Sequence, residues 1–348
     1  MNQKLSDISW QVPESEYRRD KALSYSTLAK FDREGFNKLD SLFDKVETPS
    51  LSFGSAVDAL ITGGQEEFDK NFIVADFPKI SDTVLKIVKE LFNRYSHQFT
   101  SISTIPTQNI IDLTEELKYQ LNWKPETRAK VIKEQGQEYY SILYIAQGKQ
   151  VLSVQTKEEV DAAVRALKES EGTKFYFQDN NIFDDSVQRY YQLKFKATFN
   201  NIEYRCMSDL LVVDYENKLI TPVDLKTSSH AEWDFYESFI QWSYSIQARL
   251  YWRIIRDNLD RDPYWKEFKL ADYRFIVVNR KTLTPLVWEY PDTKEIGTLY
   301  YGKNKQIECK DPFDLGKLLS NYLTTRSAVP QGIATFTPNN LKDWLNSL

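Results

Sequence analysis

The clearest pattern of apolar and polar positions lies in the second half of the chain and predicts strands. Residues 190–199 alternate between apolar and polar side chains, which is typical of a half-buried strand. Further on, short apolar runs rich in Val, Ile and Leu are bounded by turn residues, which indicates buried strands. The predicted strands cover residues 190–199, 202–213, 219–225, 273–279 and 285–290.

Helical periodicity predicts helices around these strands. The strongest is expected from Glu232 to Arg256, with one apolar stripe formed by Phe235, Phe239, Trp242, Ile246 and Leu250. A capped helix is expected to begin at Ser24 or Ser26. Further helices are predicted at 84–92, 110–121, 125–137 and 157–169, with a short strand at 139–146 and C-terminal helices from about 293, the last at 339–348.

The order of these elements predicts an α/β fold: a central mixed β-sheet flanked by helices, with a helical insertion. With 348 residues, of which 41% are hydrophobic, the chain is long enough for a packed core. We expect an N-terminal helical part at 1–80, a helical insertion or arch at 81–180, a strand-rich core at 181–300 and C-terminal helices at 301–348.

Composition excludes several classes of protein. No apolar run reaches 18 residues and the N-terminus lacks the apolar core of a signal peptide, so we expect a cytoplasmic protein without a membrane partner. Cys206 and Cys309 are too few for a disulfide framework or a four-cysteine cluster. A net charge of −5 argues against tight non-specific binding to DNA, although local basic patches matter more than the total.

Charged residues set into the predicted strands are the candidate chemistry. Asp224 and Lys226 are two residues apart and share one face of a strand, and Asp209 can lie opposite them across the hairpin. Buried carboxylates must be paired or hold a metal. With the backbone carbonyl of Leu225, these two aspartates would suit one or two Mg²⁺ or Mn²⁺ ions. A plain salt bridge between Lys226 and Asp224 is the alternative interpretation.

In order and spacing, these residues resemble the PD-(D/E)XK nuclease superfamily, and within it the RecB-like and RecE-like exonucleases of phages and bacteria. Their signature is an Asp at the end of one strand, Asp/Glu-x-Lys on the next, and a helix carrying Gln-x-x-x-Tyr. The matches are Asp209, Asp224-Leu225-Lys226 and Gln247 with Tyr251, and the resemblance covers roughly residues 24–60 and 190–290. It implies a restriction-endonuclease-like core and a metal-dependent DNA exonuclease of recombination or repair, with Asp209, Asp224, Lys226, Gln247 and Tyr251 as catalytic residues.

Two positions depart from the family pattern. The family's Gly-x-x-x-His motif, whose histidine binds metal, is matched here by Gly54 and Asp58. Asp58 could bind a hard cation or could be a solvent-facing helix residue. Many family members place a glutamate near the start of the first strand, where this chain has Gln192.

Several residues are candidates for substrate binding. Ser24 and Ser26 match the family's Ser-x-Ser-x-Leu-x-x-Phe element, and a helix N-terminus with hydroxyls suits a phosphate. Thr227 is expected in a polar loop, residues 227–229, at the strand's end, and Arg205 opens the stretch that carries Asp209. A basic set in the helical stretch could line a nucleic-acid path or form a solvated helix face: Lys118, Lys124, Arg128, Lys130 and Lys133.

The resemblance implies DNA as substrate, either a linear duplex or a single strand. It further implies a single-strand annealing protein as partner, a homo-oligomer, and the host cytoplasm as location if a phage encodes the chain. Two other functions stay open. One is a non-catalytic nuclease-like module that binds DNA ends or a recombination partner, which the aspartate at position 58 and the acidic charge favour. The other is a restriction-type endonuclease, which shares the Asp…Asp-x-Lys core.

Overall fold

The protein, seen here as a computed structural model, forms two compact units. The first, the sheet unit, comprises Met1–Glu47 and Ala163–Leu348, and the second, the helical unit, comprises Thr48–Ala162. The structure describes residues 2–36, 42, 49–76, 79–181, 183–291, 298–301 and 305–325.

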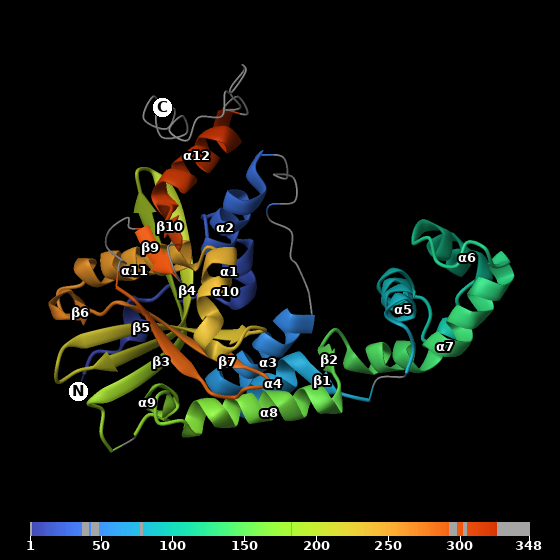
Figure 1. The fold of residues 1–348 in the computed structure, drawn as a ribbon, viewed down its shortest axis with the longest axis horizontal. Coiled ribbons are helices and arrows are strands. Elements are labelled where there is room, and N and C mark those ends of the chain that lie inside the picture. The colour runs from blue at the N-terminus through green and yellow to red at the C-terminus, as the bar shows by residue number, and fades with distance from the viewer. Residues whose placement is uncertain are drawn as a thin grey trace. The chain divides into compact units, whose positions relative to one another are not determined.

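A mixed β-sheet is the centre of the sheet unit (Figure 1). Its strand order is β3-β4-β5-β7-β8, and β6 pairs with β5 beside this path. The β3–β4, β4–β5 and β7–β8 pairs are antiparallel, whereas β5 and β7 run parallel. The bounds are β3 (Val187–Phe199), β4 (Ile202–Asp214), β5 (Leu219–Ser228), β6 (Lys269–Leu270), β7 (Tyr273–Asn279) and β8 (Leu286–Tyr290). This arrangement confirms the predicted mixed sheet and all five predicted strands.

Turn chemistry sets the register of the long hairpins. Asn200 and Asn201 join β3 to β4 with φ of 51° and 62°, a left-handed conformation that asparagine tolerates better than most residues. The register then places Phe199 opposite Ile202 and Val187 opposite Asp214. Alternate side chains of both strands therefore face the same core.

The parallel β5–β7 pair requires a crossover connection, and helices supply it. Helix α11 (Tyr244–Arg261) packs against β3, β4 and β7, with α2 (Tyr25–Glu34) and α12 (Pro312–Thr325) beside it (Figure 1). Along α11, Ile246, Leu250 and Ile254 are fully or almost fully buried, which is the expected apolar stripe of a helix on a sheet. The other elements of this unit are η1 (Leu5–Ile8), α1 (Glu14–Arg19), α9 (Lys174–Phe177), η4 (Glu232–Asp234), α10 (Phe235–Gln241), η5 (Trp265–Glu267), β9 (Thr298–Tyr301) and β10 (Lys305–Glu308).

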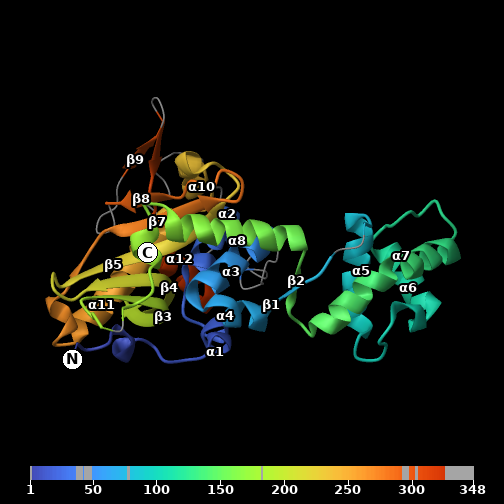
Figure 2. The same ribbon diagram turned by 90° about the horizontal axis from the view of Figure 1, so that it is seen from below.

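In the helical unit, α5 and α6 pack against the long helix α7 (Figure 2). The core between them includes Val84, Ile87 and Leu91 from α5 and Ile132 and Tyr140 from α7. A short parallel pair of strands, β1 with β2, joins the segment before α5 to the segment after α7. The bounds are α3 (Pro49–Thr62), α4 (Gly64–Asn71), β1 (Phe72–Val74), α5 (Asp82–Tyr95), η3 (Ile102–Thr104), α6 (Thr107–Glu116), α7 (Pro125–Ala146) and β2 (Gln150–Leu152), and α8 (Val154–Glu169) crosses the boundary between the units.

Three predicted helices or strands were wrong. Residues 139–146 are helical, because Tyr139 and Tyr140 are buried in the core of α5–α7 as the last turns of α7. The helix expected from Glu232 to Arg256 is broken between α10 and α11 at Trp242 and Ser243. The stretch from 293 contains the antiparallel pair β9–β10 before α12 begins.

The terminal helix predicted at 339–348 lies outside the described residues. None of the helices in the described part of the chain combines the length and the apolar composition that crossing a membrane requires.

Candidate active site

Asp209 and Asp224 lie side by side where β4 and β5 separate. The pairing of these strands runs from Asp214–Leu219 to Leu210–Val223, so the next position in the register is Asp209 beside Asp224. There the Asp209 carboxylate, through Oδ2, accepts a hydrogen bond from the backbone N–H of Leu225 at 3.0 Å. A side chain thus takes the place of the next ladder bond, and both aspartates stand at the open end of the hairpin.

The other neighbour of Asp209 is Gln192. Pairing between β3 and β4 passes from Tyr191–Leu210 to Leu193–Ser208, and Gln192 stands between these pairs with φ of 53°. A positive φ is uncommon for a residue other than glycine and often marks a functional or strained position. The ladder is therefore distorted on both sides of Asp209, at the position where the family resemblance led us to expect a glutamate.

Asp224 is part of a closed polar triangle with Lys226 and Gln247. The Asp224 side chain is almost fully buried, and the Nζ of Lys226 lies 2.6 Å from its Oδ2. The Gln247 amide donates from Nε2 to Oδ1 of Asp224 at 2.5 Å and accepts at Oε1 from Nζ of Lys226 at 3.0 Å. The contact between Lys226 and Oδ2 is an ion pair without hydrogen-bond alignment, so Oδ2 is buried with no aligned donor among the described residues.

The ammonium group of Lys226 also lies against an aromatic ring. Its Nζ lies 4.4 Å from the ring centroid of Tyr244, a cation–π contact. Burial alone would lower the pKa of Lys226, but the charge of Asp224, with smaller contributions from Tyr244, Tyr25 and Asp209, raises that pKa well above its usual value. Lys226 therefore carries its positive charge at neutral pH in this arrangement.

Tyr251 lies one helical turn after Gln247 on α11 and is buried close enough to Asp224 and Asp209 for their charges to act on it. Burial raises the pKa of Tyr251 well above its usual value, and Tyr17, Cys206, Asp224 and Asp209 add to that rise. Burial likewise raises the pKa of Tyr273, and the same aspartates add to that rise; its ring centroid lies 6.3 Å from that of Tyr251. Both phenols are therefore neutral at physiological pH.

The residues gathered here fit a hard divalent cation. Within the described part of the chain, His, Cys, Asp and Glu side chains nowhere gather in groups of three or more that could hold a metal ion. Asp209 and Asp224 nevertheless bring two carboxylates to neighbouring strands, and Oδ2 of Asp224 is a buried oxygen without an aligned donor. The carbonyl of Leu225 stays a predicted ligand. Mg²⁺ commonly binds through one or two carboxylates and takes its remaining ligands from water and phosphate.

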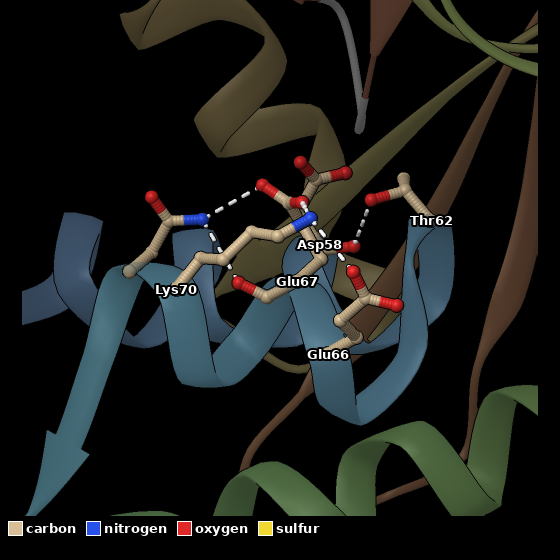
Figure 3. A network of polar contacts seen from close by, with 6 residues as sticks. Asp58, Thr62, Glu66, Glu67 and Lys70 are labelled. Atoms are coloured by element: carbon tan, nitrogen blue, oxygen red, sulfur yellow. Dashed lines mark hydrogen bonds and ion pairs between the residues drawn. The ribbon is translucent and has the colours of Figure 1, made fainter.

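The third predicted metal ligand, Asp58, belongs to the helical unit (Figure 3). It lies on α3 with its side chain half-buried, and its backbone carbonyl accepts from the hydroxyl of Thr62 at 2.9 Å. Nearby on α4, Lys70 forms ion pairs with Glu66 and Glu67 (Figure 3). The metal-binding role of Asp58 stays a prediction.

The predicted substrate-binding residues differ in their surroundings. Ser24 is buried at the start of α2, and its hydroxyl bonds to those of Ser26 (2.9 Å) and Thr27 (3.1 Å). Thr227 does not lie in the expected loop, because pairing with β7 extends β5 to Ser228; Thr227 is half-buried there, opposite Val278. Their roles in binding phosphate stay predictions.

Arg205, the fourth predicted substrate-binding residue, is engaged by the N-terminal segment. Its guanidinium donates to the carbonyls of Ala22 and Tyr17 and lies over the ring of Tyr17. Through these contacts Arg205 connects β4 to the N-terminal segment. Its role in binding substrate stays a prediction.

The basic set of the helical stretch is mixed in character. Arg128 is buried, and it donates to Thr114 and to the carboxylate of Glu115. Lys133 donates to the carbonyl of Ser103 at 3.1 Å. Of this set, Arg128 therefore has a structural role inside the helical unit.

Sequence reasoning missed a buried carboxylate beside the end of β5. Glu232 is fully buried and accepts from the backbone N–H groups of Asn279 (3.0 Å) and Thr284 (2.9 Å) and from the hydroxyl of Thr282 (2.5 Å). The Asn279 side chain in turn donates to the carbonyls of Ser228 and His230. This network, the Glu232 clamp, ties the β7–β8 loop to the segment that follows β5. No local pattern signals it, because its members are far apart in sequence.

Comparisons with known proteins do not assign a family or a function to this chain. No family model and no curated protein matches the sequence. The structure is similar to the crystal structure of a proposed exonuclease from Eubacterium rectale, with a TM-score of 0.39 and 13% sequence identity, over 100% of this chain and 88% of that chain. At this level of similarity the likeness assigns neither family nor activity, so a function must be argued from the site.

Proposed function

We propose that this protein hydrolyses phosphodiester bonds of DNA in a metal-dependent reaction, as an exonuclease. The observation that carries the proposal is the buried Asp224 with Lys226 and Gln247 around it and Asp209 beside it. Burying a carboxylate and an ammonium group costs several kcal/mol of desolvation, which stability alone does not favour. A site that binds a metal and a phosphate gives a physical reason to keep these charges together.

In the proposed reaction the chain's own residues bind and orient. Asp209, Asp224 and the carbonyl of Leu225 would hold one or two Mg²⁺ or Mn²⁺ ions. A bound divalent ion supplies Lewis acidity, which activates water and neutralises charge on the phosphate. Lys226 would orient the attacking water or stabilise negative charge on the phosphate in the transition state. Gln247 holds Lys226 and Asp224 in one geometry. Tyr251 would position substrate or close the site by stacking.

A second candidate is a nuclease-like module that binds DNA ends without cutting them. The observation that favours it is the direct contact between Lys226 and Asp224, because an ammonium group already neutralises the carboxylate that would hold the metal. A restriction-type endonuclease would share the same residues. The exonuclease is preferred because Gln247 and Tyr251 of α11 complete the resemblance to that branch.

The test is digestion of end-labelled linear DNA and closed circular DNA with Mg²⁺ or Mn²⁺, and with EDTA. The variants are Asp224→Asn, Lys226→Met and the double variant, with Lys218→Met in the exposed β4–β5 turn as control. Removing one partner of a buried pair leaves the other charge unpaired, whereas replacing both is often tolerated, so the double variant separates lost chemistry from lost folding.

We expect linear DNA alone to be degraded, EDTA to abolish the reaction, and each site variant to lose at least about a hundredfold in rate. The control should retain the wild-type rate. Cutting of the circle would favour the endonuclease. DNA binding without any metal-dependent cleavage would rule out the nuclease and favour the module that binds DNA ends without cutting them.

A further inference from the structure

The break between α10 and α11 exposes a large aromatic side chain next to the site. Trp242 belongs to the apolar stripe predicted for one continuous helix, which would bury it. In the structure 43% of its surface is exposed, and the next residue, Ser243, has φ of 54°. A positive φ costs of the order of 1 kcal/mol for a residue other than glycine, so the surrounding contacts must hold the break in place.

Helix α2 supplies those contacts. The hydroxyl of Tyr25 donates to the carbonyl of Trp242 at 2.7 Å, and Ser243 Oγ donates to Asp32 at 3.1 Å. The exposed guanidinium of Arg33 lies over the Trp242 ring, 5.2 Å from its centroid. The tryptophan is therefore held at the surface by α2 with a cation against it.

The same segment reaches the candidate active site two residues further on. Tyr244 begins α11, and its ring contacts Lys226 at 4.4 Å. Its ring centroid also lies 6.1 Å from that of Tyr25, the residue that bonds to Trp242. A series of contacts between aromatic rings and cations therefore connects the exposed tryptophan to the buried lysine. Its members are Arg33, Trp242, Tyr25, Tyr244 and Lys226.

Single exposed aromatic residues are common on protein surfaces and need no explanation. Trp242 differs because a strained backbone holds it, a guanidinium lies over it, and its neighbour contacts the ammonium group of the site. An aromatic ring beside a cation is the combination that binds a nucleobase by stacking and the adjoining phosphate by charge.

We propose that Trp242 stacks on the terminal nucleobase of a single-stranded DNA end and that Arg33 pairs with an adjoining phosphate. This inference rests on the DNA cleavage proposed above and adds the residue that receives the end of the strand. Removing the aromatic ring should weaken binding of a base-bearing end about tenfold, the usual effect of one lost base–aromatic stack.

The test compares two kinds of ten-nucleotide thymidine strand in EDTA, where no metal-dependent cleavage occurs. One kind ends in a normal thymidine, and the other carries an abasic residue at either its 5′ or its 3′ end. The wild type should bind the normal strand about tenfold more tightly than one of the abasic strands. Trp242→Ala should bind both equally, whereas Trp242→Phe should keep the preference.

Trp233 gives a matched control, because it is 56% exposed in η4, at the other end of α10, and Trp233→Ala should behave as wild type. Thermal melting of each variant confirms that it folds. A merely structural Trp242 would change affinity for both strands alike, so a preference that survives in Trp242→Ala overturns the proposal, as does a wild type without preference.

Digestion assays on the same proteins separate this proposal from the proposed function. If the wild type prefers the base-bearing end, loses that preference in Trp242→Ala and cuts no DNA, the stacking role stands and the nuclease falls. If the wild type cuts DNA and Trp242→Ala keeps the preference, the nuclease stands and the stacking role falls.

Discussion

Gln247 is the residue that holds the two charged side chains of the site in a single arrangement. A lysine can only donate and an ionised aspartate can only accept, so an amide between them has one satisfied orientation. In it, Nε2 of Gln247 faces Asp224 and Oε1 faces Lys226. The Gln-x-x-x-Tyr pattern thus has a local physical basis here.

Replacing Gln247 with methionine keeps the length of the side chain but removes both hydrogen bonds. Asp224 and Lys226 then lose the group that orients them. We expect the rate of DNA cleavage to fall about ten- to a hundredfold, the usual effect of losing a group that positions a metal ligand. The measurement is the cleavage rate at saturating metal, together with the affinity for DNA in EDTA.

Gln241→Met provides the matched control, because Gln241 is exposed at the end of α10. It should leave both quantities unchanged. A Gln247→Met variant that cuts DNA at the wild-type rate would show that the ion pair keeps its geometry without the amide.

At the scale of secondary-structure elements, the strands follow from the sequence and the broken helix does not. The alternation in 190–199 and the apolar runs of β4 and β5 are local patterns, so they predict strands directly. The break at Trp242 depends on the Tyr25 hydroxyl and on Asp32, which lie more than 200 residues earlier. The apolar periodicity of residues 232–256 cannot indicate contacts with such distant residues. The prediction therefore continued the helix through Trp242 and placed this side chain in the core.

The Glu232 clamp should make the folded state sensitive to acid. Burial would raise the pKa of Glu232, but hydrogen bonds from Thr282 and from backbone N–H groups outweigh it and lower that pKa below its usual value. A lowered pKa stabilises the fold above the pKa of the unfolded chain, about 4.3, and this stability is lost as the pH falls through the folded value. The β7–β8 loop should therefore loosen in acid.

Glu232→Gln tests this directly. We expect it to lower the free energy of unfolding at pH 7 by about 1.5–3 kcal/mol, the usual worth of a hydrogen bond to a charged group. The loss should shrink as the pH falls below about 5 and through the lowered pKa of the folded state, because the wild type then loses the same charge. Urea denaturation across this pH range measures both. Glu237→Gln, at an exposed carboxylate on α10, should show neither effect.

Helix α7 contains a glycine that allows α5 to approach closely. A β-carbon at Gly136 would clash with the side chain of Val88 and press on that of Ile102. Alanine favours an isolated helix, but a valine branched at its β-carbon has little freedom to move away. We expect Gly136→Ala to destabilise the helical unit by about 1–3 kcal/mol in spite of its better helix propensity.

Hydrogen exchange of α5 and α7 measures this change locally. Gly172→Ala is the matched control, because a β-carbon there meets open space, and it should leave these rates unchanged. Slower exchange in Gly136→Ala would mean that α5 and α7 adjust to the extra methyl group without cost.

At the scale of the whole molecule, the helical stretch that contains the predicted basic set carries no net charge. Between residues 82 and 146 there are eight acidic and eight basic residues, so this stretch is neutral. Its core is self-contained, since every member of the cluster around Ile87, Ile132 and Tyr140 lies between Ile80 and Leu143. The sequence predicted a helical insertion from periodicity, but the closing pair β1–β2 joins segments of three residues, too short for a pattern to reveal.

Residues 77–148 should be removable without unfolding the sheet unit. The pairing of Phe72–Val74 with Gln150–Leu152 holds the two ends together, and none of Asp209, Asp224, Lys226 or Gln247 comes from the removed stretch. A ten-residue Gly-Ser linker spans about 17 Å on average, which exceeds the rise of about 10 Å along a three-residue strand. The shortened chain should therefore fold with its sheet and its candidate site intact.

Calorimetry provides the measurement. A helical core that shares none of its buried side chains with the sheet unit should unfold as a unit of its own, so the wild type should show an additional transition that the shortened chain lacks. The remaining transition should stay within a few degrees, because the core around α11 and the sheet keeps all its members. A shortened chain that aggregates, or whose sheet unit melts far below the wild type, would show instead that the two units depend on each other for stability.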